Sequence, residues 1–451
     1  YKIAAYTLAG NSSEDVNLDT VAFDVAVEDG TTFTAADLTD VILKIDGVVV
    51  GTPKATISAT GNSYSVSVVL PKNGSKTIEL WANIGSSITA GDSIITTTTV
   101  SGVGASSSVT STTGGVAAQE IDTGSGTITA SADASRPVAS IVDDAGTKSA
   151  AAFKFEAATD SFNITDLVFT IADVSAVSKI KLYDGTTLVA QKDPATTVNF
   201  NGLAWNIPAN TSKVLRVELD IGTVGVGSGT SGASTLVTLT SGTATNGAGT
   251  SAAITESPAN PAGNAMYVYK AIPTVTNLAL PTTLLQTGTQ VVSKFSVGTN
   301  GTGTIGWKKL IFTVTREMGG TDTLATPTLW DADTNTQIAG TPAFTGSVEA
   351  DGGTSGTITF VADDEQQISG SKSYYLKVVT AGTFVTGNNL NVSIAQPSSY
   401  VAPAAYATVA GTSSSFTWSD LSAQSHSLTT LDWSNGFLVK NLPTDSQTLT
   451  K

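Results

Sequence analysis

The chain has 451 residues, a formal net charge of −15, no cysteine and only 13% charged residues. The acidic balance with scattered Lys and Arg argues against nucleic acid or an anionic membrane as a partner, and the lack of cysteine excludes disulfides, zinc-thiolate sites and thiol nucleophiles. No apolar stretch approaches the ~18 residues of a transmembrane helix, so we expect a chain that is soluble or held on a surface by something outside it.

Short apolar runs bounded by Gly, Pro, Asn and Asp recur along the chain and predict β-strands almost throughout. Examples in chain order are SYSVSVVL (63–70), KVLRVELDI (213–221) and SYYLKVV (373–379). Asp-Gly pairs at 46–47 and 184–185 lie between apolar runs and predict hairpins.

Three sequence blocks recur in the same order three times, which is the strongest signal in the sequence. The first block reads LDTVAFDV (18–25), ITDLVFTI (164–171) and IGWKKLIFTV (305–314), and it brings Phe23, Phe169 and Phe312 into register. The second is LKIDG (43–47), IKLYDG (180–185) and PTLWDAD (327–333). The third is SKTIELWANIG (75–85), SKVLRVELDIG (212–222) and SKSYYLKVVTAG (371–382).

These repeats predict an all-β fold, a tandem array of three immunoglobulin-like β-sandwich domains followed by a C-terminal β tail. The expected bounds are 1–125, 126–270 and 271–412 for the sandwiches and 413–451 for the tail, which carries the WSD and DWSNG motifs. Two alternatives stay open for the tail. It could fold back on the third domain, or it could dock on the first domain of the next subunit in a head-to-tail contact that builds open polymers.

The first repeat starts one strand later than the other two. A leading segment precedes the strand at 150–157 in the second repeat and the strand at 291–297 in the third, whereas YKIAAYTLAG (1–10) corresponds to that later strand. Either the chain is a piece of a longer array, or a neighbouring subunit supplies the missing strand. Strand addition would satisfy the exposed backbone groups and the apolar groove that such a gap leaves, and both alternatives can hold together.

The repeat pattern over residues 133–221 and the closing motif FTWSDLSAQSHSLTTLDWSNGFLVKNLP (416–443) resemble large repetitive cell-surface proteins of the candidate phyla radiation (Patescibacteria). The resemblance covers most of the chain, and the closing motif is its most specific part. It implies an S-layer or surface-filament protein, and it supplies no catalytic residues to transfer.

Signals for enzymatic chemistry are thin. The single histidine, His426, lies between Ser425 and Ser427, but chain neighbours in a strand point to opposite faces, so neither serine would face the imidazole. The sequence also has no G-x-S-x-G, H-E-x-x-H or P-loop motif. We therefore expect a surface or packing histidine and a protein that is not an enzyme.

One loop has the spacing of a calcium ligand set. In DADTNTQ, Asp331, Asp333 and Asn335 occupy the first three EF-hand positions, but the loop lacks the Gly and Glu that complete this motif. It also lies where the other repeats have an Asp-Gly hairpin. A solvated hairpin loop and a weak Ca²⁺ site are the two alternatives, and we expect no other cofactor.

The function that these observations favour is a non-enzymatic extracellular structural protein that self-assembles on the cell surface, as an S-layer or filament subunit. Its main partners would be copies of itself, joined by β-strand donation, with a cell-envelope anchor or a glycan left open as a further partner. The alternative is a surface adhesin or binding module carried on immunoglobulin-like stalk domains.

Overall fold

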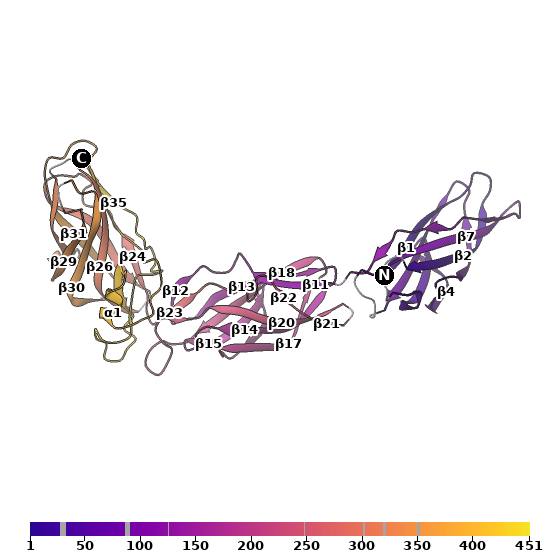
Figure 1. The fold of residues 1–451 in the computed structure, drawn as a ribbon, viewed down its shortest axis with the longest axis horizontal. Helices are drawn as coiled ribbons and strands as arrows, with labels where there is room; N and C mark the ends of the chain where they lie inside the picture. The colour runs from indigo at the N-terminus through magenta and orange to yellow at the C-terminus, as the bar shows by residue number, and fades with distance from the viewer. Residues whose placement is uncertain are drawn as a thin grey trace.

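The computed structural model describes residues 1–27, 33–85, 91–124, 126–247, 249–300, 303–318, 322–349 and 352–451. Within these ranges the chain is almost entirely β, apart from α1 (Tyr406–Ala410) and a 3₁₀ turn (Ala35–Asp37). Three β-sandwiches follow one another along an elongated molecule (Figure 1), which confirms the predicted all-β tandem array. No helix among the described residues has the length and apolar character needed to cross a membrane.

The first sandwich packs two sheets face to face. One has the order β1-β6-β3-β4, and its strands are β1 (Lys2–Ala9), β6 (Ser75–Ile84), β3 (Leu38–Ile45) and β4 (Val48–Thr56). The other has the order β10-β7-β2-β5, with two short strands also on β7; its strands are β10 (Ile121–Asp122), β7 (Ser93–Gly104), β2 (Val16–Val27), β5 (Asn62–Leu70), β8 (Thr110–Thr112) and β9 (Val116–Ala117). The predicted hairpin at 46–47 joins β3 to β4, with φ of 51° at Asp46 and 80° at Gly47, as a type I′ turn requires.

The second sandwich repeats this plan with two strands, β11 and β22, added at one edge. Its first sheet, in order, contains β16 (Thr187–Lys192), β15 (Val177–Asp184), β18 (Thr211–Ile221), β13 (Thr147–Ala158), β11 (Thr127–Ala132) and β22 (Thr255–Glu256). The facing sheet contains β17 (Thr197–Ile207), β14 (Phe162–Ile171), β20 (Val237–Asn246) and β21 (Ser251–Ala253). A small sheet toward the third sandwich contains β12 (Ser140–Asp143), β23 (Met266–Tyr269) and β19 (Ala233–Ser234).

The third sandwich has the same core plan. Its first sheet contains β24 (Pro273–Asn277), β25 (Gly288–Thr299), β31 (Ser371–Ala381), β27 (Thr323–Asp331) and β28 (Thr336–Gln337). The facing sheet contains β29 (Gly340–Gly346), β30 (Ser355–Ser369), β26 (Thr304–Glu317), β32 (Asn389–Ile394), β35 (Gln447–Thr450), β33 (Phe416–Ser419) and β34 (Trp433–Ser434).

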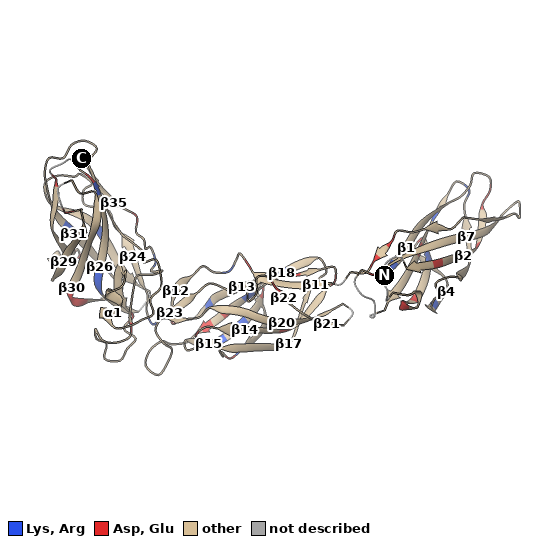
Figure 2. Ribbon diagram, viewed as in Figure 1, with Lys and Arg blue, Asp and Glu red and all other residues tan. Residues whose placement is uncertain are grey.

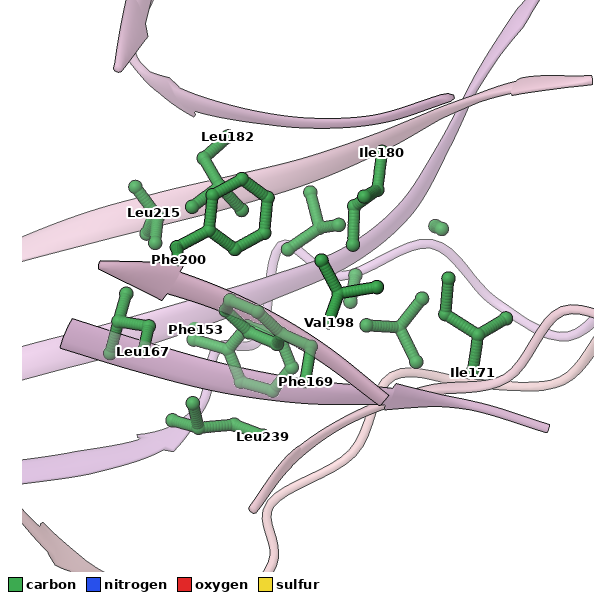
Figure 3. Close-up of a cluster of buried hydrophobic side chains, with 14 of the residues drawn as sticks. Phe153, Leu167, Phe169, Ile171, Ile180, Leu182, Val198, Phe200, Leu215 and Leu239 are labelled. Atoms are coloured by element: carbon green, nitrogen blue, oxygen red, sulfur yellow. The ribbon is translucent and has the colours of Figure 1, made fainter. Parts of the chain in front are cut away.

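Each sandwich buries its own hydrophobic cluster, because alternate residues of its strands point between the two sheets. The phenylalanines that the sequence blocks bring into register are all buried, with Phe23 1% exposed and Phe169 and Phe312 fully covered. In the second sandwich the ring of Phe169 lies 5.6 Å from that of Phe153 and 6.0 Å from that of Phe200 (Figure 3). The shared block therefore supplies the centre of each core.

The C-terminal segment belongs to the third sandwich. β33 pairs with β26, placing Trp418 opposite Trp307, and β35 pairs with β32. Trp418 and Leu449 are fully buried members of the third hydrophobic cluster. Of the two alternatives for residues 413–451, the structure shows the first: the segment folds back onto its own chain.

Candidate functional site

His426 lies in a polar cluster that ties the closing motif to β30. Its Nδ1 is 2.8 Å from Asp432 Oδ2, and its Nε2 is 3.0 Å from Glu365 Oε2. The buried Ser419 hydroxyl is 3.5 Å from Nδ1. A catalytic triad needs the nucleophile and the carboxylate on opposite ring nitrogens, whereas here Ser419 and Asp432 share one nitrogen and Glu365 occupies the other. The arrangement is that of a packing histidine that bridges two carboxylates.

Replacing His426 with Gln is expected to lower the free energy of unfolding of the third sandwich by about 1.5–3 kcal/mol, because one of the two carboxylates loses its hydrogen bond from the ring. Urea denaturation followed by tryptophan fluorescence measures this loss. Thr429→Ala, in the exposed part of the same loop, is the control and should change little. Equal stability of the His426 variant and the wild type would show that the bridge contributes nothing.

The predicted calcium loop is the turn between β27 and β28. Asp331 Oδ1 accepts the backbone N–H groups of Asp333 (2.9 Å) and Thr334 (3.0 Å), and Asp333 Oδ2 accepts that of Ser373 (3.0 Å). Burial raises the pKa of Asp331, but the N–H donors of the turn outweigh this and leave the pKa below its ordinary value. Asn335 completes the turn with φ of 53°.

The hairpin alternative for this loop is therefore present in the structure, with its carboxylates engaged by backbone N–H groups. Among the described residues, no group of three or more His, Asp or Glu side chains is placed to hold a metal ion. The Ca²⁺ alternative for Asp331, Asp333 and Asn335 stays a prediction, and calorimetric titration of the chain with Ca²⁺ tests it.

A buried aspartate joins the second and third sandwiches. Asp420, fully covered, accepts hydrogen bonds at Oδ2 from the Ser231 hydroxyl (2.9 Å) and the Lys270 backbone N–H (3.0 Å), and at Oδ1 from the Ser422 N–H (3.2 Å). Since Ser231 belongs to the second sandwich and Asp420 to the closing motif, this contact fixes one to the other. The WSD motif is distinctive in the sequence, but nothing in its residues indicates this role.

Aromatic and small residues complete this junction. The rings of Tyr267 and Tyr400 stack with centroids 3.8 Å apart, and the Tyr400 hydroxyl donates to the Gly232 carbonyl at 2.8 Å. The Asn300 side-chain amide donates to Asp143 Oδ2 at 2.6 Å. Contacts from several segments on each side thus hold the second and third sandwiches together.

Burial raises the pKa of Asp420, and the nearby Asp432 carboxylate raises it further. The hydrogen bonds from Lys270, Ser422 and Ser231 lower the pKa, but they do not outweigh burial. A carboxyl whose pKa is raised by folding binds protons more readily in the folded state. Its contribution to stability is therefore fully present below the unfolded pKa near 3.8 and is lost as the pH rises through the folded value.

We accordingly expect the stability difference between wild type and Asp420→Asn to shift in favour of the wild type as the pH falls from 7 toward 4. Chemical denaturation at a series of pH values measures this difference. A difference that is constant with pH, or that shifts toward the variant in acid, contradicts the assignment.

The first sandwich has an open edge at β1. The Ser-Lys block lies on β6, β18 and β31 in the three sandwiches. Each of these strands pairs antiparallel with an equivalent neighbour, which is β1, β13 and β25 respectively. The far side of β13 is covered by β11, and the far side of β25 by β24. β1 has β6 on one side and no strand on the other among the described residues. In the other two sandwiches the equivalent edge is the one that β11 and β24 occupy.

A groove runs beside this edge, and we call it the edge groove. It has a volume of ≈ 320 Å³ and opens between the two sheets of the first sandwich. One wall is β1 and the other is the segment after β8; the lining includes Tyr6, Leu8, Thr98, Val100, Val116 and Ala118. No charged side chain lines the groove. Elsewhere in this acidic chain, charged residues are spread over all three sandwiches (Figure 2).

Comparisons with known proteins place the chain in no family. No family model matches it, and no curated protein matches it. Solved structures with similar parts include the C-terminal domain of the AgI/II polypeptide BspA of Streptococcus agalactiae, 8% identical with a TM-score of 0.16, covering 59% of this chain and 95% of that one.

Two further similar structures are a putative membrane anchored protein from Corynebacterium diphtheriae and the CupB6 tip adhesin from Pseudomonas aeruginosa. The first is 11% identical with a TM-score of 0.18, over 86% of this chain and 81% of that one. The second is 10% identical with a TM-score of 0.19, over 58% of this chain and 91% of that one. At such identities and TM-scores the likeness carries no argument about function.

Proposed function

We propose that the protein is a non-enzymatic structural protein of the cell surface that self-assembles, as an S-layer or filament subunit, by adding a strand of a neighbouring subunit to its first sandwich. The observation that carries the proposal is that, among the residues the structure describes, β1 has one neighbouring strand where β13 and β25 have two. An open edge beside an apolar groove leaves backbone groups and side chains uncovered, and strand addition satisfies both.

The rest of the chain suits a building unit. Tandem sandwiches make an extended body, and the contacts of Asp420 and Tyr400 hold the second and third sandwiches together. A contact between the first sandwich of one copy and a different surface of the next is heterologous, so it extends into an open polymer. The resemblance to repetitive surface proteins of Patescibacteria supports the same class of function and an extracellular location.

Negative-stain electron microscopy of the native protein, isolated without denaturant, tests whether it assembles. We expect regular filaments or sheets, whose repeat distance would also distinguish a linear polymer from a lattice. Dispersed rods at all concentrations would rule out self-assembly as the function.

A surface adhesin carried on stalk domains is the second candidate, and one polar hollow favours it. The hollow lies on the third sandwich, has a volume of ≈ 520 Å³, and is lined by Thr315, Arg316, Glu317, Thr354, Asn389, Asn391, Thr448 and Thr450. Hydroxyl, amide and charged groups are those that hydrogen-bond the hydroxyls of a glycan. Binding of the chain to a glycan array, lost in Asn391→Leu, would support this function.

A further inference from the structure

We propose that a patch on the outer face of the third sandwich binds a polysaccharide that carries carboxylates. The patch lies on the first sheet of this sandwich, and we call it the basic aromatic patch; its residues are Lys294, Tyr375, Trp330 and Lys377. The ammonium groups of the two lysines contact the carboxylates, and the two rings contact the sugars. This inference goes beyond the proposed function, because the patch shares no residue with the edge groove and needs no contact between copies of the chain.

The first step is the placement of the four side chains on one face of the sheet. Along β31, Tyr374 is fully buried between the sheets, so Tyr375 and Lys377 point away from the core, since side chains of a strand alternate between faces. Lys294 and Trp330 lie directly opposite Tyr375 on β25 and β27. Opposite residues share a face, so the four side chains stand together in a row about 10 Å wide, and all are partly exposed.

The second step is the way the rings hold the ammonium groups. Lys377 Nζ lies 3.6 Å from the centre of the Trp330 ring system and 5.7 Å from the centre of the Tyr375 ring. Lys294 Nζ lies 5.4 Å from the centre of the same tyrosine ring. Aromatic faces attract cations but do not neutralise them. Within the part of the chain that the structure describes, neither ammonium group forms an ion pair, so their N–H donors remain available to an anion.

The third step is a comparison with the same positions in the other two sandwiches. Aligned on the lysine of the Ser-Lys block, Tyr375 corresponds to Glu79 in the first sandwich, whose carboxylate pairs with the lysine of β1 at 3.1 Å. Lys377 corresponds to Glu218 in the second, which pairs with Arg216 at 3.1 Å. Each of the first two sandwiches therefore has a carboxylate here that neutralises a cation, whereas the third has a tyrosine and a second lysine instead.

The fourth step is the chemistry of the ligand. Two positive charges without acidic partners, in a chain of net charge −15, attract an anionic group. The surrounding acidic surface repels a polymer as highly charged as nucleic acid, and four side chains are far fewer than the roughly 20–30 residues a side of a stable protein interface.

The aromatic rings add apolar contact area to these charges. Trp330 Nε1 donates to Thr328 Oγ1 at 3.0 Å, so the indole presents carbon atoms to a ligand and not its N–H group. A polysaccharide with carboxylates separated by neutral sugars supplies both the anionic groups and the C–H surfaces that such rings contact.

The first experiment titrates the full 451-residue chain with an oligosaccharide fragment of hyaluronate, which carries a carboxylate on every second sugar. We expect saturable binding by calorimetry that weakens as salt is added. The same fragment with its carboxylates methyl-esterified should bind about tenfold more weakly or not at all, because each charge-assisted hydrogen bond is lost. Equal binding of the two fragments, or binding of neither, overturns the proposal.

The second experiment locates the site with matched variants. Lys377→Gln should weaken hyaluronate binding by about tenfold. Lys44→Gln is the control, since Lys44 Nζ lies over the Trp81 ring of the first sandwich at 4.3 Å and the substitution removes the same charge from the chain. Similar losses in both variants would reflect the overall charge of the chain and would refute binding at the patch.

The third experiment tests the role of the rings. Trp330→Leu should also weaken hyaluronate binding by about tenfold, while Trp81→Leu should not, and circular dichroism melting verifies that both variants are folded. Unchanged affinity of Trp330→Leu would contradict the contact with the sugars. Oligothymidylate is the competing ligand, and tighter binding of it than of hyaluronate would assign the patch to nucleic acid and overturn the proposal.

The outcomes separate this inference from the proposed function. Hyaluronate binding by a protein that forms only dispersed rods would retain the patch as a polysaccharide site and refute self-assembly. Polymers that do not bind hyaluronate would retain self-assembly and refute this inference. Loss of those polymers in Lys377→Gln would further assign the patch to a contact between copies of the chain.

Discussion

Deletion of residues 413–451 is expected to unfold the third sandwich while the second keeps its fold. The segment supplies five buried residues to the third hydrophobic cluster, namely Phe416, Trp418, Val439, Leu442 and Leu449. Truncating one large buried side chain costs about 2–5 kcal/mol, and a domain has only about 5–15 kcal/mol of stability, so losing five exceeds what the sandwich holds. The core of the second sandwich contains none of these residues.

Differential scanning calorimetry measures this outcome, because the deletion should remove the transition of the third sandwich. Trp418→Ala alone should lower its stability by about 3–5 kcal/mol, whereas Leu431→Ala, in a side chain that is 71% exposed, should change little. A deletion variant whose third sandwich melts at the wild-type temperature would mean that the segment is not part of that core.

Substitution of Gly232 by Ala is expected to open the junction between the second and third sandwiches. Gly232 has φ of 71°, and a Cβ there would lie 2.5 Å from Pro403 Cγ and 2.6 Å from the Tyr400 hydroxyl. The left-handed backbone costs about 1–2 kcal/mol for a residue with a side chain, and the overlap adds about 1–3 kcal/mol. The stacked Tyr267 and Tyr400 rings should separate as Pro403 is displaced.

Gly227→Ala is a matched control, since Gly227 has φ of 75° but no atom within 4 Å of a new Cβ. Both variants carry the backbone strain, and only the Gly232 variant carries the overlap. Small-angle scattering should show a change in the distance between the second and third sandwiches for Gly232→Ala and none for Gly227→Ala. The same scattering profile for both variants would contradict a tightly packed junction.

The repeats made the sandwiches predictable, because a strand with one buried face carries its alternation in the sequence. Phe23, Phe169 and Phe312 identify the three central strands from the amino-acid sequence alone, and the same alignment of the repeats locates the open edge at β1. Short-range signals were also sufficient for the Asp-Gly turn at 46–47, whose positive φ angles follow from local backbone chemistry.

Contacts between distant polar residues were not predictable. Asp420 and Ser231 are 189 residues apart, and His426 and Glu365 are 61 apart. A single hydrogen bond between polar side chains produces no periodic pattern in the sequence. Neither the contacts of the junction nor those of the histidine cluster could therefore be predicted from the sequence. For the same reason the sequence does not determine where residues 413–451 dock, since an apolar tryptophan does not indicate which core it enters.

Assembly through the edge of β1 is tested most directly with two matched variants of the native protein, Val116→Asp and Val109→Asp. Both valines lie in the first sandwich and are similarly exposed, at 53% and 60%, but only Val116 lines the edge groove. A carboxylate at 116 would be buried without a partner by an incoming strand. Electron microscopy should show wild-type polymers for Val109→Asp and dispersed subunits for Val116→Asp. Normal polymers of Val116→Asp would contradict assembly through this edge.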